Sequence, residues 1–163
     1  MDVRSEQIEK LKNLYQFDGT KDLMFPTTKL REVPDGKAIN AIGSYIDEIS
    51  ANWIFLPDYN DAHSYHKMVF DWCLACTKVL RHPSVKNVLI MKILSETSFG
   101  HPGSPFTPNL YIDISDTLEQ KIQASMVYNT ETGKHPFPRN QEDIRALAML
   151  RGSEAGVKFA EAF

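Results

Sequence analysis

The sequence predicts an α/β fold with a mostly parallel sheet. Short apolar runs alternate along the chain with segments whose apolar residues recur at helical spacing, which is the pattern of strands joined by crossover helices. The run at 52–57 shows little alternation, as is typical of a strand covered on both faces. With 163 residues and no internal repeat, we expect a single domain over residues 1–163.

Five segments carry helical periodicity. The fourth opens with Asp116-Thr117-Leu118-Glu119, which has the form of a capping box. Asn140 is a candidate cap for the fifth, and Gly152 a candidate stop. The expected helices cover 4–15, 36–51, the segment from His66 to about Leu80, 116–128 and 140–152.

Apolar runs between these helices predict the strands. Pro26 ends the first of them, and the last one alternates up to Phe163. The expected strands are 22–25, 52–57, part of 85–94, 109–114 and 157–163.

Composition excludes several classes of function. A formal net charge of -3 gives no basic field, so we expect no nucleic-acid partner. No apolar run approaches the ~20 residues that cross a bilayer, so we expect no membrane partner. The charged N-terminus does not resemble a signal peptide, and two cysteines make no disulfide framework. We therefore expect a cytoplasmic protein.

Two histidines follow directly after the expected strand 52–57. His63 and His66 stand one helical turn apart, at the carboxyl end of a strand, where open α/β folds place their chemistry. Imidazole suits both zinc ligation and general acid catalysis. Asp61 could cap the helix or orient an imidazole, and Asp58 flanks the same motif. The spacing alone does not separate this interpretation from ordinary capping histidines.

Other candidates are Glu96 and a cysteine pair. Glu96 follows a strand and would reach the same edge of the sheet as the histidines, or it is a solvated loop residue. Cys73 and Cys76 could form a redox dithiol, but Cys73 lies well inside the helix rather than at its N-terminus. A shared zinc site with His66 would have to span ~10 Å of helix. We therefore interpret the cysteines as buried free thiols.

Several segments together resemble the LmbE-like, or PIG-L, zinc deacetylases. The stretch Asn60-Asp61-Ala62-His63-Ser64-Tyr65-His66 is similar to the second signature of that family, roughly Asn-Asp-x-His-x-Asp-His-x-x-Val. Further segments resemble one bacterial and archaeal branch: Phe25-Pro26-Thr27-Thr28-Lys29-Leu30, Leu94-Ser95-Glu96-Thr97, Pro108–Ile114, His135-Pro136-Phe137-Pro138-Arg139, Ala146-Leu147-Ala148 with Arg151-Gly152, and Ala160-Glu161-Ala162-Phe163.

The resemblance implies a Rossmann-like three-layer sandwich and zinc-dependent hydrolysis of an N-acetyl amide on a glucosamine-type sugar. By motif position, His66 would be a zinc ligand. His63, with Asp61 beside it, would stabilise the oxyanion and protonate the leaving amine. Arg4 matches an arginine that faces the sugar in the family, and we expect Glu96 and Arg4 on the substrate side.

The sequence also departs from the family pattern. The first signature, Ala-His-Pro-Asp-Asp-Glu, is absent, and it would carry two further zinc ligands and the general base. Tyr65 stands in place of an aspartate, and Gln7 in place of a glutamate. The expected fold therefore lacks its first strands, and one remaining ligand cannot hold zinc tightly.

We expect this chain to be inactive alone, with uncovered strand edges that a complementing chain or self-association covers. Three classes of function stay open: a zinc amide hydrolase active only with a complementing segment, a non-catalytic binding or assembly subunit derived from the fold, and a dithiol redox protein.

Overall fold

A computed structural model describes residues 3–26 and 28–163, which fall into two compact units. One unit comprises residues 21–107 with Phe163, and we call it the histidine unit. The other comprises residues 1–20 and 108–162, and we call it the terminal unit.

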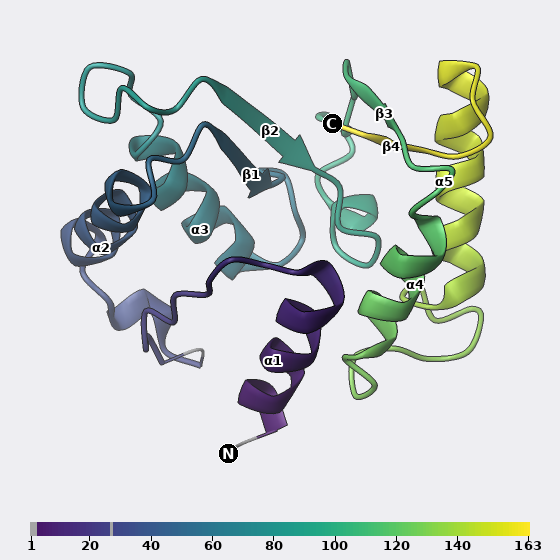
Figure 1. The fold of residues 1–163 in the computed structure, drawn as a ribbon, viewed down its shortest axis with the longest axis horizontal. Helices are drawn as coiled ribbons and strands as arrows, with labels where there is room; N and C mark the ends of the chain where they lie inside the picture. The colour runs from purple at the N-terminus through teal and green to yellow at the C-terminus, as the bar shows by residue number, and fades with distance from the viewer. Residues whose placement is uncertain (1–2, 27) are drawn as a thin grey trace. The chain divides into compact units, whose positions relative to one another are not determined.

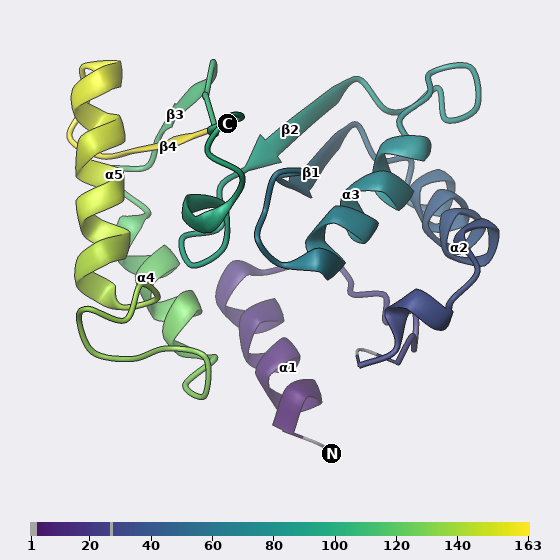
Figure 2. The ribbon, with the colours of Figure 1, turned by 180° about the vertical axis from the view of Figure 1, so that it is seen from behind.

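The histidine unit is built on a strand-helix-strand crossover. Strands β1 and β2 pair in parallel, with Trp53 opposite Asn87 and Pro57 opposite Met91. Helix α3 connects them, and it packs against β1 and α2 (Figures 1 and 2). The elements in chain order are the 3-10 helix η1 (Leu30–Glu32), α2 (Asp35–Glu48), β1 (Trp53–Pro57), α3 (Ser64–Ala75), β2 (Asn87–Met91) and the 3-10 helix η2 (Thr97–Phe99).

The core of this unit lies on one side of the two strands. Ile46, Cys76 and Val85 are buried together, and partly buried residues of α2 and β1 pack around them. Within β1, Leu56 is fully buried, whereas Trp53 and Phe55 remain 52% and 48% exposed. The expectation that both faces of this strand are covered is therefore wrong for its first half.

The terminal unit pairs two short strands against helices. Strands β3 and β4 are antiparallel, with Tyr111 opposite Ala162, and α5 packs against both. Helix α4 contacts α1 and α5, and its Leu118 and Ile122 are buried. The elements are α1 (Val3–Tyr15), β3 (Tyr111–Asp113), α4 (Leu118–Met126), α5 (Gln141–Ala155) and β4 (Ala160–Ala162). The fold is thus mixed α/β, and the parallel pairing predicted for the sheet is found in β1–β2, whereas β3–β4 is antiparallel.

Helix α5 begins as predicted but ends later. The Asn140 side chain accepts a hydrogen bond from the backbone N–H of Asp143 at 2.8 Å, which is the expected N-cap. The helix ends at Gly156, which adopts a left-handed conformation with φ 73°. Gly152 lies inside the helix, where an added Cβ would lie 2.7 Å from the carbonyl oxygen of Lys158. Gly152 therefore allows close approach of backbone and does not stop the helix.

Three further expectations are wrong at the level of single elements. Residues 22–25 form no strand, because Asp22 accepts a hydrogen bond from the backbone N–H of Met24 and Met24 has a positive φ of 54°. Helix α3 ends at Ala75 and does not reach Leu80, which is 97% exposed. At α4 the predicted capping box does not form: the side chain of the N-cap Thr117 makes no capping hydrogen bond, and Glu119 pairs with Arg145.

Candidate functional site

The loops that follow β1 and β2 meet at the carboxyl ends of these parallel strands. The backbone N–H of Ala62 donates to the carbonyl of Glu96 at 3.2 Å, which joins the two loops. Helix α3 starts immediately afterwards, with His63 as its N-cap and His66 in its first turn. The structure therefore places the two histidines and Glu96 at one end of the strand pair, where the sequence predicts them.

His66 is held by a buried carboxylate. Its Nδ1 lies 2.7 Å from Oδ2 of Asp61, a residue with no exposed surface. Burial raises the pKa of Asp61, and the hydrogen bond from His66 opposes that rise. The other carboxylate oxygen, Oδ1, is buried without a hydrogen-bond partner among the described residues. Asp61 therefore orients His66, the alternative to helix capping that the sequence leaves open.

The Nδ1 atom of His63 accepts a hydrogen bond, whereas the Nδ1 atom of His66 faces a carboxylate acceptor. The backbone N–H of Tyr65 donates to Nδ1 of His63 at 3.2 Å, so His63 itself is the cap of α3. The imidazole rings of His63 and His66 stack with centroids 4.6 Å apart and planes 18° from parallel. One ring therefore lies directly against the other.

The two hydrogen bonds assign different tautomers to neutral His63 and His66. An ionised carboxylate only accepts, so Nδ1 of His66 carries the proton and its Nε2 keeps a free lone pair. Nδ1 of His63 accepts from a backbone N–H, so the proton of that ring is on Nε2. The stacked pair thus presents one Nε2 that can bind a metal or a proton and one Nε2 that can donate a hydrogen bond.

A long-range clamp fixes the loop before the histidines. Oδ1 of Asp58 accepts from the backbone N–H of Asn60 at 2.6 Å, and the Asn60 amide donates to the carbonyls of His101 and Ser104. An added Cβ at Gly100 would lie 2.0 Å from the backbone oxygen of Asn60. The sequence does not reveal this clamp, because its partners are 41 and 44 residues away from Asn60.

Glu96 lies close enough to Asp61 to act on it electrostatically. Its charge contributes to the raised pKa of Asp61, behind the larger effect of burial. Oε1 of Glu96 accepts from the Ser95 hydroxyl at 3.2 Å, and the Glu96 side chain is partly exposed. The Glu96 carboxylate therefore lies near Asp61, and its place in the substrate site stays a prediction.

Tyr65 uses its hydroxyl to hold a neighbouring segment. It donates to the backbone carbonyl of Thr28 at 3.0 Å, and its ring lies 5.6 Å from that of His63. A tyrosine here brings no carboxylate to the histidines. It ties the segment before η1 to the first turn of α3 instead.

Arg4 belongs to the terminal unit. Its guanidinium pairs with Glu131 and lies 4.8 Å from the ring centroid of Tyr128. Gln7, on the same helix α1, is buried and donates to the backbone carbonyl of Val127 at 3.3 Å. These contacts hold α1 to the segment after α4.

The described residues do not by themselves fit a zinc ion. Among residues 3–26 and 28–163, no group of three or more His, Cys, Asp or Glu side chains is placed to hold a metal.

Burial raises the pKa of Cys73 to about 11, and Cys76 is fully buried, so both remain protonated thiols near neutral pH. Both cysteines are free thiols, as predicted, but only Cys76 is buried, whereas Cys73 is partly exposed. The raised pKa of Cys73 does not suit a redox dithiol.

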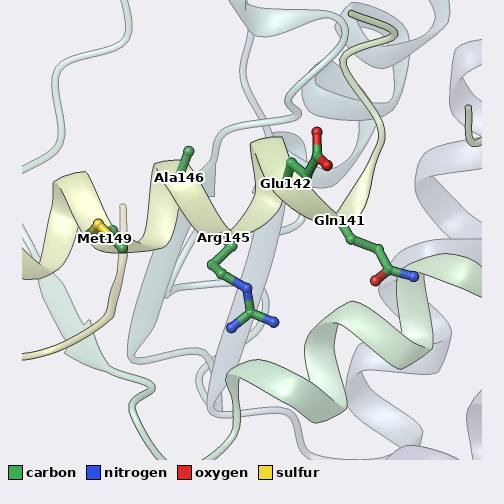
Figure 3. Close-up of a pocket in the computed structure, with 5 residues that line it drawn as sticks. All are labelled: Gln141, Glu142, Arg145, Ala146 and Met149. Carbon is green, nitrogen blue, oxygen red and sulfur yellow. The ribbon is translucent and has the colours of Figure 1, made fainter. Parts of the chain in front are cut away.

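A groove of about 350 Å³ runs along α5 in the terminal unit (Figure 3). Its lining includes Arg145, whose guanidinium is occupied by both carboxylate oxygens of Glu119, together with Ala146 and Met149. None of the site residues predicted from the sequence lines it.

In the described part of the chain, no helix is long and apolar enough to span a bilayer.

Comparison with known proteins supports the fold. No family model matches the chain, and no curated protein matches it in sequence. The solved structures that it resembles include the conserved protein TT1542 from Thermus thermophilus, with a TM-score of 0.78 and 19% identity over 99% of this chain and 71% of that one. They also include N,N'-diacetylchitobiose deacetylase from Pyrococcus horikoshii in complex with an inhibitor, with a TM-score of 0.64 and 17% identity over 99% of this chain and 62% of that one. The chain thus has a deacetylase-like fold and spans about two thirds of these proteins.

Proposed function

We propose that this chain carries the histidine half of a zinc-dependent hydrolytic centre that removes the acetyl group from an N-acetylated glucosamine-type sugar. The observation that carries the proposal is the pair of opposite tautomers in His63 and His66, fixed by Asp61 and by the start of α3. Hydrolysis of an amide needs a hydrogen-bond donor for the developing oxyanion and a proton for the leaving amine. A stacked pair with one donor and one acceptor is suited to such a centre.

In this proposal the histidines have separate roles. Nε2–H of His63 would donate a hydrogen bond to the carbonyl oxygen as negative charge develops there, and the proton that the leaving amine takes up would come from the attacking water. Nε2 of His66 is one zinc ligand, and Asp61 is a positioning residue that fixes its tautomer. Among the described residues no further donors stand with His66 to hold a metal, so a zinc ion would need donors from another segment.

The fold and the surrounding charges support this assignment. The chain shares its fold with an enzyme described as a diacetylchitobiose deacetylase, although 17% identity supports the fold rather than the activity. The loop of Glu96 is joined to the loop that carries the histidines, and we propose that the Glu96 carboxylate contacts the hydroxyl groups of the sugar. Arg4 is the second proposed substrate contact, and its guanidinium would have to exchange Glu131 for the sugar.

A partner is part of the proposal. Within the described residues, β1 pairs only with β2 and β2 only with β1, so each has one unpaired outer edge. Parallel sheets are normally covered on both faces, and isolated two-stranded sheets are marginally stable. We propose that a complementing segment, or a second copy of this chain, covers these edges in a cytoplasmic setting. Light scattering that shows a monomer without hydrophobic-dye binding would contradict this part.

One observation favours a second candidate, a non-catalytic binding or assembly subunit. No group of three metal-binding side chains occurs in the described residues, and three protein ligands are the usual minimum for catalytic zinc. In this second candidate function, the chain has the same fold and the same kind of partner but catalyses no reaction.

The deciding experiment supplies the missing donors. The chain would be coexpressed with a polypeptide that carries a strand ending in Ala-His-Pro-Asp-Asp-Glu, and acetate release from N-acetylated chitooligosaccharides would be measured. We expect release that falls by ~100-fold or more in His63→Ala and in His66→Ala. His135→Ala is the matched control and should leave release unchanged, since the exposed His135 side chain contacts Asp143 and none of the proposed site residues. A stable, zinc-loaded complex with no release would favour the assembly subunit.

A further inference from the structure

The segment between α3 and β2 carries exposed apolar side chains at its tip. Val79 and Leu80 are 57% and 97% exposed, and the residues on either side are the exposed cations Lys78 and Arg81. Figure 1 shows this segment reaching out past the ends of the two strands. We call residues 78–81 the apolar tip.

The base of this segment is firmly held. Val85 and Cys76 are buried in the core of the histidine unit, on either side of the tip. His82 pairs with Asp47 at 2.8 Å, and the Asn52 amide donates to the carbonyl of Ser84 at 3.0 Å. Within the tip, Arg81 N–H donates to the carbonyl of Lys78 at 2.8 Å, which closes a turn. The apolar tip is thus a fixed projection and not an unanchored loop.

Within the apolar tip, both charged side chains are positive. Neither Lys78 nor Arg81 has an ion-pair partner in the described residues, and Lys86 donates only to the carbonyl of Pro83 nearby. The nearby carboxylates lie at the base and not in the tip, where Asp47 contacts His82 and Glu48 pairs with Lys21. A convex aliphatic tip between unpaired cations fits a soft, negatively charged surface better than a rigid protein pocket.

We propose that the apolar tip is a membrane-docking element that inserts Val79 and Leu80 into a bilayer rich in anionic lipid. It lies at the amino ends of β1 and β2, so the histidines at the carboxyl ends would face away from the lipid. This proposal does not rest on the proposed hydrolytic function. It concerns peripheral contact alone, since no helix of the described residues could span a bilayer.

Cosedimentation of the full chain with vesicles of phosphatidylcholine, with and without phosphatidylserine, tests the proposal. At about 0.1 M salt we expect at least ~10-fold tighter binding to the anionic vesicles, and loss of that gain at about 1 M salt. Leu80→Glu should weaken binding by ~10-fold or more, and Lys78→Glu with Arg81→Glu should remove the preference for anionic lipid. Met24→Glu is the matched control, because Met24 is 81% exposed away from the tip.

A Leu80→Trp variant gives a second readout, since its fluorescence should shift to shorter wavelength when anionic vesicles are added. Equal binding to both kinds of vesicle would overturn the proposal, as would equal effects of Leu80→Glu and Met24→Glu. A dimer in solution that Leu80→Glu dissociates would also overturn it, because a second copy would then be the occupant of the tip.

Discussion

The imidazole rings of His63 and His66 stack with centroids 4.6 Å apart, yet each ring is bound through Nδ1 to a group of opposite polarity. The carboxylate of Asp61 accepts from one ring, and the backbone N–H of Tyr65 donates to the other. Stacked neutral histidines with the same tautomer would present two equivalent nitrogens to a ligand. These two present a lone pair and a proton.

The first prediction concerns these tautomers. Long-range ¹H–¹⁵N correlation spectra of the neutral histidines should show His66 protonated at Nδ1 and His63 at Nε2, because of their hydrogen-bond partners. Asp61→Ala should leave His66 as a mixture of tautomers. His101 provides the internal reference, since its Nδ1 accepts from the backbone N–H of Gly103 at 3.1 Å and should stay protonated at Nε2 in both proteins. If His66 kept its proton on Nδ1 in the variant, Asp61 would not be what orients it.

The second prediction concerns the dependence of stability on pH. Burial raises the pKa of Asp61 above the ordinary aspartate value of about 3.9. Between the unfolded and the raised folded value, the folded chain holds a proton that the unfolded chain releases. The free energy of unfolding contributed by this residue should therefore fall as pH rises through that window.

Asp61→Asn removes the titrating group and can still accept from His66, so its unfolding free energy should lose that downward slope. Asp71→Asn changes an exposed aspartate on α3 and is the control. Urea denaturation at several pH values makes the measurement. Parallel pH profiles for wild type and Asp61→Asn would show that Asp61 has no raised pKa.

The third prediction uses glycines. Gly100→Ala would place a Cβ 2.0 Å from the backbone oxygen of Asn60, a contact that no side-chain rotation relieves. We expect it to lower the free energy of unfolding by about 1–3 kcal/mol and to loosen the loop at 100–104. Gly36→Ala is the matched control. Its Cβ would meet nothing within 4 Å inside helix α2, so we expect a gain of about 0.5 kcal/mol. Thermal melts of both variants decide, and equal melting temperatures would contradict the close contact.

Local periodicity predicted most of the fold. The four strands and helix α4 lie within the predicted segments. Helices α1, α2 and α5 overlap their predicted segments with small shifts at the ends, because their apolar spacing and, for α5, the Asn140 cap are local signals. The prediction failed where one side chain changes the backbone, as Asp22 does at Met24. It also failed where a long-range contact decides, as at Gly152, whose neighbours follow the end of its own helix.

In the candidate site too, local sequence patterns predicted some features, and long-range contacts that the sequence does not reveal decide the others. A strand followed by two histidines was enough to place His63 and His66 at the ends of the parallel strands, and the carboxyl end of β2 brought Glu96 to them. The Asn60 clamp and the hydrogen bond from Tyr65 to Thr28 join residues 37 to 44 positions apart. No spacing rule in a single sequence reports such contacts. The zinc ion and the roles of the site residues remain predictions.

The last prediction concerns the two thiols. Burial raises the pKa of Cys73 to about 11, so only about one thiol in a thousand is ionised at pH 8. Burial also raises the pKa of Cys76, whose Sγ donates to the backbone carbonyl of Ile39 at 3.3 Å. In the native chain, both should react with a disulfide reagent at pH 8 at least ~100-fold more slowly than a free cysteine. In urea both should react at the free-thiol rate, which is the control for accessibility of the reagent. Cys73→Ser should leave the slow native rate unchanged, whereas one fast thiol in the folded wild type would restore the dithiol redox class.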